Sequence, residues 1–290
     1  MYVVVKLGKG AFSEVRSGVH ISSGMPVAIK CLALAKLSKK DEKDVAMEIE
    51  LLREVQHPHV VKLFDDYRDK HFIYMVLEVI QGGELFDWIV SREYFLEEEA
   101  RDLMYTLLQT IAHLHYRHIV HRDIKPENIL MVDKTANSSV KLTDFGFAAR
   151  CPNDHCLREA CGSPSYVAPE VLKRVPYGRP ADVWSLGVVG YILLCGYTPF
   201  DASSDKEMFE LTKRGQYQFH SDAWDMISDE AKDLISHLLV VNPESRFTAR
   251  QALDHPWFAR AGLKTRSLDI TLVNLKKFQA LKKFRVAGKA

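Results

Sequence analysis

The stretch His121-Arg122-Asp123-Ile124-Lys125-Pro126-Glu127-Asn128, with Asp144-Phe145-Gly146 further along the chain, decides the fold. Together they put two aspartates, an asparagine and a lysine in loops between apolar runs. Upstream, Val27-Ala28-Ile29-Lys30 places a lysine in an apolar strand, where an unpaired ammonium group would be costly. Glu48 in the next helix is a natural partner, although an exposed glutamate on a charged helix is an equally plausible interpretation.

A second candidate element is Gly8-Lys9-Gly10-Ala11-Phe12-Ser13, which holds two of the three glycines of the G-x-G-x-x-G pattern. Glycine lets backbone N–H groups approach phosphate oxygens without a Cβ in the way. A dinucleotide-binding fold would continue into a helix, but this chain continues as Val15-Arg16-Ser17-Gly18-Val19, which is typical of a strand. We therefore predict a hairpin here.

The secondary-structure pattern changes character near residue 80. Before it, strands are predicted over 3–7, 15–19 and 26–32, with one helix over 41–55 capped by Ser38 or Asp41. After it, residues 97–115 place apolar side chains at helical spacing behind an acidic first turn. We predict a small β-rich lobe followed by a larger helical lobe, joined near 78–83 at the flexible Gln81-Gly82-Gly83, with a ligand cleft between them.

The composition narrows the function classes. The chain has 290 residues, 39 Lys+Arg against 38 Asp+Glu, and 47% hydrophobic residues, as in an ordinary globular protein. A net charge of +1 argues against nucleic acid as the main partner. The longest apolar stretch, Trp184–Tyr197, is too short for a membrane span and is expected to be a buried helix. Five cysteines without Cys-x-x-Cys favour a reducing compartment, the cytosol or the nucleus.

The order of these motifs resembles that of the eukaryotic protein kinases. The resemblance runs from the glycine loop through Ala168-Pro169-Glu170 to His255-Pro256-Trp257-Phe258, nearly the whole chain. Five motifs in the family's order are specific evidence. The resemblance implies an α+β, bilobal protein-kinase-like fold with an ATP cleft between an N-terminal lobe (1–80) and a C-terminal lobe (81–258). Residues 259–290 would form a basic regulatory segment.

The resemblance also assigns catalytic roles. Lys30, paired with Glu48, would hold the ATP phosphates, and Asp123 would orient the substrate hydroxyl and accept its proton. Lys125 would neutralise the transferred phosphoryl group, and Ser163 would position Asp123. The Asp-Ile-Lys-Pro-Glu-Asn wording resembles the kinases that phosphorylate serine and threonine rather than tyrosine.

ATP and Mg²⁺ are the implied cofactors. Asn128 and Asp144 would hold Mg²⁺, and Leu77 would be the gatekeeper behind the adenine. The backbone of Glu78 and Val79 would offer hydrogen bonds to the adenine. The remaining residues expected around ATP are Leu7, Gly8, Gly10, Val15, Ala28, Glu84 and Leu130.

Two further acids face the place where a substrate peptide lies in the family. Glu84 and Glu127 favour protein substrates with an arginine three residues before the phosphorylated residue, through charge-assisted pairing. In the alternative interpretation both are solvated acids, and Glu84 serves only the ribose. Structural roles are expected for Glu170, paired with Arg246, and for Asp182, which would anchor the catalytic loop.

The segment from Asp144 to Glu170 has an informative gap. Between Gly146 and Ser163 it contains no Ser, Thr or Tyr, so the arginine of the His-Arg-Asp stretch lacks a phosphate acceptor in the usual place. Either Glu159 substitutes in part for that phosphate, or the segment is ordered without modification. The segment also carries three cysteines, for which free thiols are favoured over a redox switch or a metal site: Cys151, Cys156 and Cys161.

The last segment, 268–290, mixes apolar and basic residues. Such a helix is typical of a calmodulin target or a membrane-surface segment, or it simply packs on the large lobe. The stretch 271–278 resembles the autoinhibitory segment of the calcium/calmodulin-dependent kinase group, and the junction of calcium-dependent kinases that carry their own EF-hands. We expect it to cover the peptide or nucleotide site until calmodulin or a calmodulin-like calcium sensor extracts it. Thr271 occupies an autophosphorylation position of one branch, but Leu268 replaces the arginine three residues earlier.

A competing class is a pseudokinase scaffold that binds partners without transferring phosphate. Such proteins typically lose the residues equivalent to Lys30, Asp123 or Asp144, and all three are present. By comparison with the family, the sequence stops within the regulatory helix, which suggests a fragment.

Overall fold

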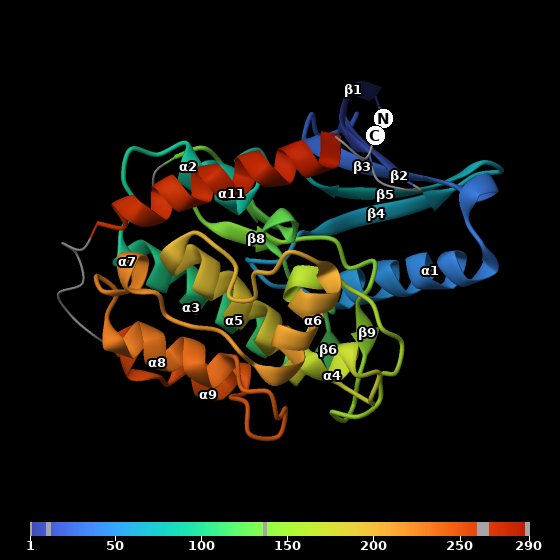
Figure 1. The fold of residues 1–290 in the computed structure, drawn as a ribbon. Helices are drawn as coiled ribbons and strands as arrows, with labels where there is room; N and C mark the ends of the chain where they lie inside the picture. Colours follow the sequence, from blue (N-terminus) through green and yellow to red (C-terminus); the bar gives the residue numbers. More distant parts are fainter. Residues whose placement is uncertain (1, 10–12, 136–137, 260–266, 288–290) are drawn as a thin grey trace.

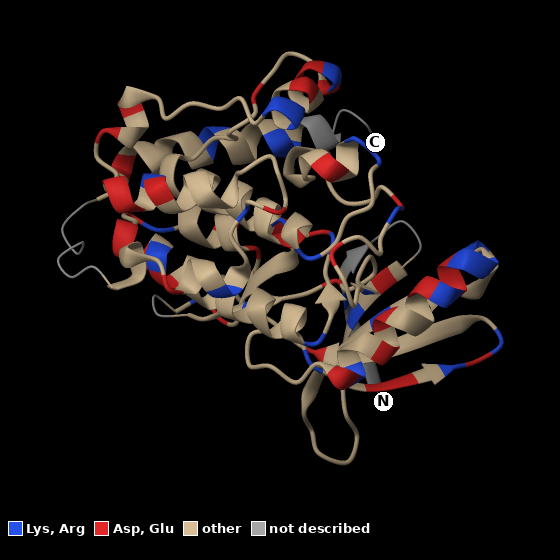
Figure 2. Ribbon diagram, turned by 90° about the horizontal axis from the view of Figure 1, so that it is seen from below, with Lys and Arg blue, Asp and Glu red and all other residues tan. Residues whose placement is uncertain are grey.

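The computed structural model describes residues 2–9, 13–135, 138–259 and 267–287. Figure 1 shows an N-terminal lobe built on one sheet and a larger helical lobe. The predicted α+β, two-lobed architecture is therefore confirmed. In the view of Figure 2, acidic and basic residues are interspersed over the molecule rather than gathered by sign on one face.

The N-terminal lobe is an antiparallel sheet with one long helix. The strands lie in the order β1 (Tyr2–Lys9), β2 (Ser13–Val19), β3 (Pro26–Ala33), β5 (Phe72–Glu78) and β4 (Leu63–Arg68). A short 3₁₀ turn, η1 (Leu34–Lys36), precedes helix α1 (Lys39–Glu54). This helix begins earlier than predicted because the Ser38 side chain accepts from the Asp41 N–H, while the Asp41 carboxylate accepts from the Ser38 N–H.

The C-terminal lobe is organised around α5 (Pro180–Cys195), an apolar helix that is buried along its length and packs against α3 (Glu97–Tyr116). Two small sheets pair β6 (Ile119–Val120) with β9 (Ala149–Arg150) and β7 (Ile129–Met131) with β8 (Val140–Leu142). Among the described residues, no helix is both long and apolar enough to cross a membrane. The remaining elements are α2 (Leu85–Val90), η2 (Pro126–Asn128), η3 (Pro164–Tyr166), α4 (Pro169–Leu172), α6 (Asp205–Arg214), α7 (Ser221–Trp224), α8 (Asp229–Leu238), α9 (Ala249–Leu253) and α10 (Pro256–Ala259).

The connection between the lobes is packed tightly. The N–H of Gly82 donates to the Met131 carbonyl at 3.0 Å. A Cβ at Gly82 would lie 2.2 Å from the Asp133 carbonyl oxygen and 2.5 Å from that of Met131. Gly82 is buried, so glycine is required here for close approach of two backbones and not for the flexibility that the sequence suggested.

The last helix, α11 (Asp269–Ala287), lies along the C-terminal lobe beside α2 and α5 (Figure 1). Leu272 and Leu275 are buried, and the Thr271 hydroxyl donates to the Leu194 carbonyl of α5 at 2.6 Å. Gly196, at the C-terminal end of α5, has φ of 86°, and a Cβ there would lie 2.5 Å from the Thr271 carbonyl oxygen. Glycine at 196 thus satisfies the backbone angle and also makes room for α11.

Candidate active site

A buried ion pair joins the two long elements of the N-terminal lobe. The Nζ of Lys30 on β3 lies 2.8 Å from Oε1 and 3.0 Å from Oε2 of Glu48 on α1, as expected. The same Nζ lies 3.4 Å from Oδ1 of Asp144. Burial alone would lower the pKa of Lys30, but the Glu48 and Asp144 carboxylates outweigh it and hold the pKa above its usual value. Lys30 is therefore a fixed cation held between the Glu48 and Asp144 carboxylates.

The catalytic loop forms one hydrogen-bonded network around Asp123, which is 2% exposed. The Ser163 hydroxyl donates to Oδ1 of Asp123 at 2.8 Å, and Lys125 Nζ lies 2.7 Å from its Oδ2. The amide nitrogen of Asn128 donates to the Asp123 carbonyl at 2.8 Å and to Oδ2 at 3.0 Å. Lys125 also donates to the Ser163 hydroxyl at 2.8 Å. Three predicted side chains of the stretch 121–128 thus meet Ser163, which comes from a separate stretch of sequence.

Asp182 of α5 anchors this loop through hydrogen bonds to its backbone. Its carboxylate accepts from the backbone N–H of His121 at 2.8 Å and of Arg122 at 2.9 Å, and from His115 Nε2 at 3.0 Å. Arg122 has φ of 68°, a left-handed conformation that is uncommon for a residue with a side chain. Asp182 is the expected anchor, because its two backbone hydrogen bonds fix the loop at this strained residue.

Asp144 is the other left-handed residue at the site, with φ of 60°. Burial would raise the pKa of its carboxyl group, but Lys30, with His121 and Lys125 also nearby, lowers the pKa below its ordinary value. The carboxylate is consequently charged at neutral pH. Its side chain remains 49% exposed, so it is accessible to solvent.

Most of the predicted adenine residues lie on strands of the N-terminal lobe. Ala28 of β3 is buried and is paired with Leu77 of β5, while Val15 of β2 is paired with Lys30. The N–H of Glu78 donates to the Lys62 carbonyl at 2.9 Å, so the expected hydrogen bonding of Glu78 to adenine is restricted to its carbonyl oxygen. Of the other predicted residues, Leu7 and Gly8 are on β1, Val79 follows β5, Leu130 is on β7, and Gly10 lies outside the described residues.

Of the two acids predicted to face a peptide, Glu127 is paired with a lysine of α11, and a neighbouring acid, Asp87, is paired with the next lysine. Lys282 Nζ lies 2.8 Å from Oε1 of Glu127, and Lys283 Nζ lies 3.0 Å from Oδ1 of Asp87. Glu84, at the start of α2, is half-buried; burial raises its pKa, which the nearby charge of Lys282 opposes. Sequence reasoning missed Asp87, because nothing in the linear pattern distinguishes it from any other acid on a short helix.

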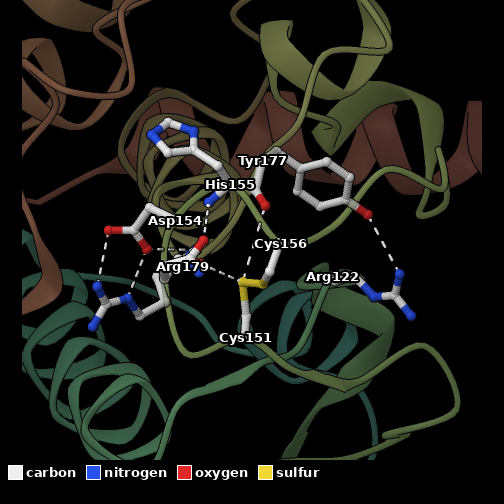
Figure 3. The surroundings of a disulfide bond; sticks show 8 residues. Arg122, Cys151, Asp154, His155, Cys156, Tyr177 and Arg179 are labelled. Atoms are coloured by element: carbon white, nitrogen blue, oxygen red, sulfur yellow. Dashed lines mark hydrogen bonds and ion pairs between the residues drawn. A yellow bond between two sulfur atoms is a disulfide. The ribbon is translucent and has the colours of Figure 1, made fainter.

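The segment after Asp144 differs from the expectations in two ways. Cys151 and Cys156 form a disulfide (Figure 3), so the prediction of free thiols is wrong for this pair and confirmed for Cys161. The loop folds back so that the two Cα atoms lie 5.7 Å apart, within disulfide reach. In addition, the Glu159 carboxylate pairs with Lys40 of α1 and not with the arginine of the catalytic loop.

Arg122 instead donates to the Phe147 carbonyl and, at 3.4 Å, to the Tyr177 hydroxyl. The expected pair of Glu170 with Arg246 is present and fully buried, with N–O distances of 2.7 and 2.9 Å. Tyr177 is the residue of this region that sequence reasoning missed; its signal would have been an aromatic residue shortly before a buried helix, which is too common to single out.

Comparison with known proteins matches residues 1–258 to the family described as "Protein kinase domain". The chain is 42% identical over 286 residues, 98% of its length, to "Calcium/calmodulin-dependent protein kinase type 1" of Caenorhabditis elegans, covering 82% of that protein. It is 41% identical over 285 residues to "Calcium/calmodulin-dependent protein kinase type II subunit delta" of Oryctolagus cuniculus, covering 54% of it. With the charged site described above, these findings show that the chain belongs to the protein kinase family, as a serine/threonine kinase of the calcium/calmodulin-dependent group.

Proposed function

We propose that the chain transfers the γ-phosphoryl group of ATP to serine or threonine of protein substrates, with Asp123 as the catalytic carboxylate. The observation that carries this is the network in which Ser163 and Lys125 both contact Asp123, at 2.8 and 2.7 Å. Asp123 holds the substrate hydroxyl in line and accepts its proton. Lys30 binds phosphate oxygens, and Lys125 offsets the negative charge of the group in transfer.

Asn128 and Asp144 fit the Mg²⁺ that the family uses with ATP. The amide nitrogen of Asn128 is engaged by Asp123, which leaves its amide oxygen as the group for a cation. The Asp144 carboxylate is charged and accessible. Oxygen ligands of this kind are those that Mg²⁺ prefers. When bound, Mg²⁺ would offset the charge of the ATP phosphates.

A basic residue upstream of the phosphorylated residue is the proposed substrate feature. Lys282 satisfies only Oε1 of Glu127, and among the described residues Oε2 is buried without a hydrogen-bond partner. An unmade hydrogen bond to a buried carboxylate oxygen is unfavourable. An arginine fork can donate to both oxygens at once, whereas an ammonium group acts as a point charge. An arginine-bearing peptide can therefore replace Lys282 with a gain in hydrogen bonds.

Autoinhibition by α11 follows from the same contact, because substrate and Lys282 would compete for Glu127. The exposed side of α11 carries Ile270, Val273, Leu281 and Phe284, which are 45%, 52%, 60% and 78% exposed. Apolar residues beside lysines on one helix are what calmodulin grasps. The relatives are named for dependence on calcium and calmodulin. We propose that calmodulin, or a similar calcium sensor, extracts α11 and opens the peptide site.

The test is a transfer assay with labelled ATP and Mg²⁺ on paired peptides that differ only in arginine or alanine three residues before the acceptor serine. Each pair is measured with and without calcium and calmodulin. We expect transfer to the arginine peptide, increased by calcium and calmodulin together. Binding of ATP with no transfer under any condition would instead support a scaffold role, and equal use of the two peptides would contradict the role of Glu127.

A further inference from the structure

The disulfide lies in the segment from Asp144 to Glu170, called the activation segment from here on. It joins two cysteines in different surroundings. Cys151, directly after β9, is 0% exposed, whereas Cys156 is exposed. The bond closes a short loop, since the cysteines are five residues apart in sequence. An external thiol can therefore reach one sulfur of the bond but not the other. Exposed disulfides of this kind are the ones that exchange readily.

The closed loop is docked on the residues that lead into α5 (Figure 3). Asp154 within the loop accepts from Arg179 through both oxygens, at 2.7 and 2.9 Å. Leu157, just after the loop, exchanges two backbone hydrogen bonds with Tyr177, at 3.0 and 2.9 Å. A Cβ at Gly178 would lie 2.5 Å from Cα of Asp154, so the two backbones are in close contact. Closing the loop thus fixes a surface that fits residues 177–179.

Tyr177 carries this fit to the catalytic loop. Its hydroxyl donates to the Glu159 carbonyl at 2.6 Å and accepts from Arg122 at 3.4 Å. Burial raises the pKa of Tyr177 to about 12, so the hydroxyl keeps its proton at neutral pH. Arg122 precedes Asp123, the proposed catalytic carboxylate. Two residues, Tyr177 and Arg122, therefore link the docked loop to Asp123, the proposed acceptor of the substrate proton.

The sequence gives this segment no site for the phosphorylation that usually orders it. Between Gly146 and Ser163 there is no hydroxyl-bearing side chain to phosphorylate. A cross-link restricts the conformations open to a loop once it undocks, and so favours the docked form. The Cys151–Cys156 bond can therefore supply the restriction that a phosphate supplies in other kinases.

We propose that Cys151 and Cys156 form a reversible thiol–disulfide site that sets the order of the activation segment, with the oxidised form binding protein substrate more tightly. The reductant is a dithiol, either a small molecule or a protein with a paired-cysteine site. The proposal rests on the kinase function for its activity readout and concerns the regulation of that site.

The exchange balances as a two-electron reduction. A thiolate of the dithiol attacks Sγ of the exposed Cys156; a mixed disulfide forms there, and the bond to Cys151 breaks. The electron pair of that bond goes to Sγ of Cys151, which takes up a proton. The second thiol of the dithiol, as thiolate, then attacks the dithiol's first sulfur, which is bonded to Cys156 in the mixed disulfide. This releases the Cys156 thiolate, which is protonated. The protein gains two thiols, and the dithiol becomes an internal disulfide.

The reduced form is also accommodated. Sγ of Cys151 lies 2.7 Å from the Asn153 carbonyl oxygen and 4.0 Å from that of Tyr177. Once reduced, the buried thiol can donate to a carbonyl oxygen already beside it, so its burial leaves no unmet donor. Both redox states can therefore exist in the folded protein, as a reversible site requires.

The experiment equilibrates the whole chain in buffers of reduced and oxidised dithiothreitol. The thiol state of 151–156 is read by alkylation and mass spectrometry, and the KM for an arginine-bearing peptide is measured on the same samples. We expect one redox midpoint in both readouts, and a KM about three- to tenfold higher in the reduced form with kcat changed less. Hydrogen exchange at Leu157 and Tyr177 should become faster on reduction.

Two variants sharpen the test. Cys156→Ser keeps the buried Cys151 thiol and should show the high KM in every buffer, whereas Cys161→Ser in the same segment should keep the redox dependence. A pair that stays reduced throughout, or equal KM values for the two forms, would overturn the proposal. If no phosphate is transferred in either form, the proposed function fails instead; exchange at Leu157 and Tyr177 then decides the redox proposal, and exchange that ignores the thiol state would end it.

Discussion

The catalytic loop and the second half of α11 meet at Glu127, which the loop carries and which Lys282 contacts. The two regions are held in opposite ways. The loop hangs on Asp182, a fully buried carboxylate that binds two backbone N–H groups. The second half of α11 is held by Lys282 at Glu127, by Lys283, whose side chain is 68% exposed, at Asp87, and by the Gln279 amide, which also donates to Asp87. Buried charge-assisted hydrogen bonds fix geometry, while exposed pairs contribute little and are screened by salt. The catalytic loop is thus held rigidly, and the second half of α11 is held more loosely, as its proposed release requires.

The strongest test of the fixed region is Asp123→Asn. The amide is similar in shape but cannot accept the substrate proton, so kcat should fall by about a thousandfold or more. ATP binding should change little, because Lys30 and Asp144 do not depend on this carboxylate for their own pairing. Steady-state transfer and nucleotide titration by fluorescence measure the two quantities.

The matched control for Asp123→Asn is Asp102→Asn on the surface of α3, which should leave kcat unchanged. Turnover retained in Asp123→Asn would remove the central role from this residue. Loss of ATP binding together with turnover would show that the substitution had disturbed the cleft as a whole.

A buried ion pair away from the cleft tests stability rather than catalysis. Glu170→Gln leaves the Arg246 guanidinium, 0% exposed, without its counter-charge. We expect the free energy of unfolding to fall by about 3–5 kcal/mol in urea titrations. Glu210→Gln breaks the exposed pair with Lys213 on α6 and should leave that free energy within error. Equal losses in the two variants would erase the distinction between buried and exposed pairs.

The loosely held region is tested by the double variant Lys282→Ala/Lys283→Ala. Without the lysine contacts to Glu127 and Asp87, and with only the Gln279 amide still donating to Asp87 at 3.1 Å, the second half of α11 should leave the peptide site more often. Activity without calmodulin should then rise about three- to tenfold, and the difference from wild type should shrink in high salt, which weakens the same contacts. Peptide phosphorylation at two ionic strengths measures this.

The same helix offers its own control for that double variant. Lys276→Ala/Lys277→Ala removes two exposed lysines from the first half of α11, where the helix is held by buried side chains. This variant should keep the low basal activity. An equal rise in both double variants would mean that total charge, and not the contact with Glu127, restrains the enzyme.

The smallest expected effect concerns acid. Burial, with the nearby charges of His113, His59 and Lys141, lowers the pKa of His57 to about 4, from about 6.5 in an unfolded chain. Between these two pKa values His57 is protonated in the unfolded chain but not in the folded chain. The free energy of unfolding therefore falls as the pH drops from 6.5 toward 4. His57→Asn should remove roughly 1 kcal/mol of that fall, because partial exposure screens the effect.

Urea titrations at pH 7, 5.5 and 4.5 measure the dependence. His20→Asn, on the exposed hairpin of the N-terminal lobe, is the control and should follow the wild-type curve. If His57→Asn also followed it, the half-buried histidines between the lobes would not be a source of acid sensitivity.

The catalytic contacts were predictable because each residue type has one chemical task at a fixed place in its motif. Lys30 needs an anion inside an apolar strand, and Glu48 lies 2.8 Å away. The contacts of α11 were not predictable, since helix direction and docking decide that Lys282 meets Glu127 and Lys283 meets Asp87. The disulfide was missed for a related reason: a Cys-x₄-Cys spacing does not state whether the loop folds back, and here the docking of Asp154 on Arg179 makes it do so.

Gly196 is a position at which the docking of α11 on α5 can change. It lies on the side of α5 that receives α11, where any added side chain would push against the Thr271 backbone. The loop that carries Asp123, the proposed catalytic residue, is bound to the opposite end of the same helix through Asp182. Under the proposed release of α11, a substitution at this end of α5 would alter how firmly α11 docks without touching the proposed catalytic residues near the other end.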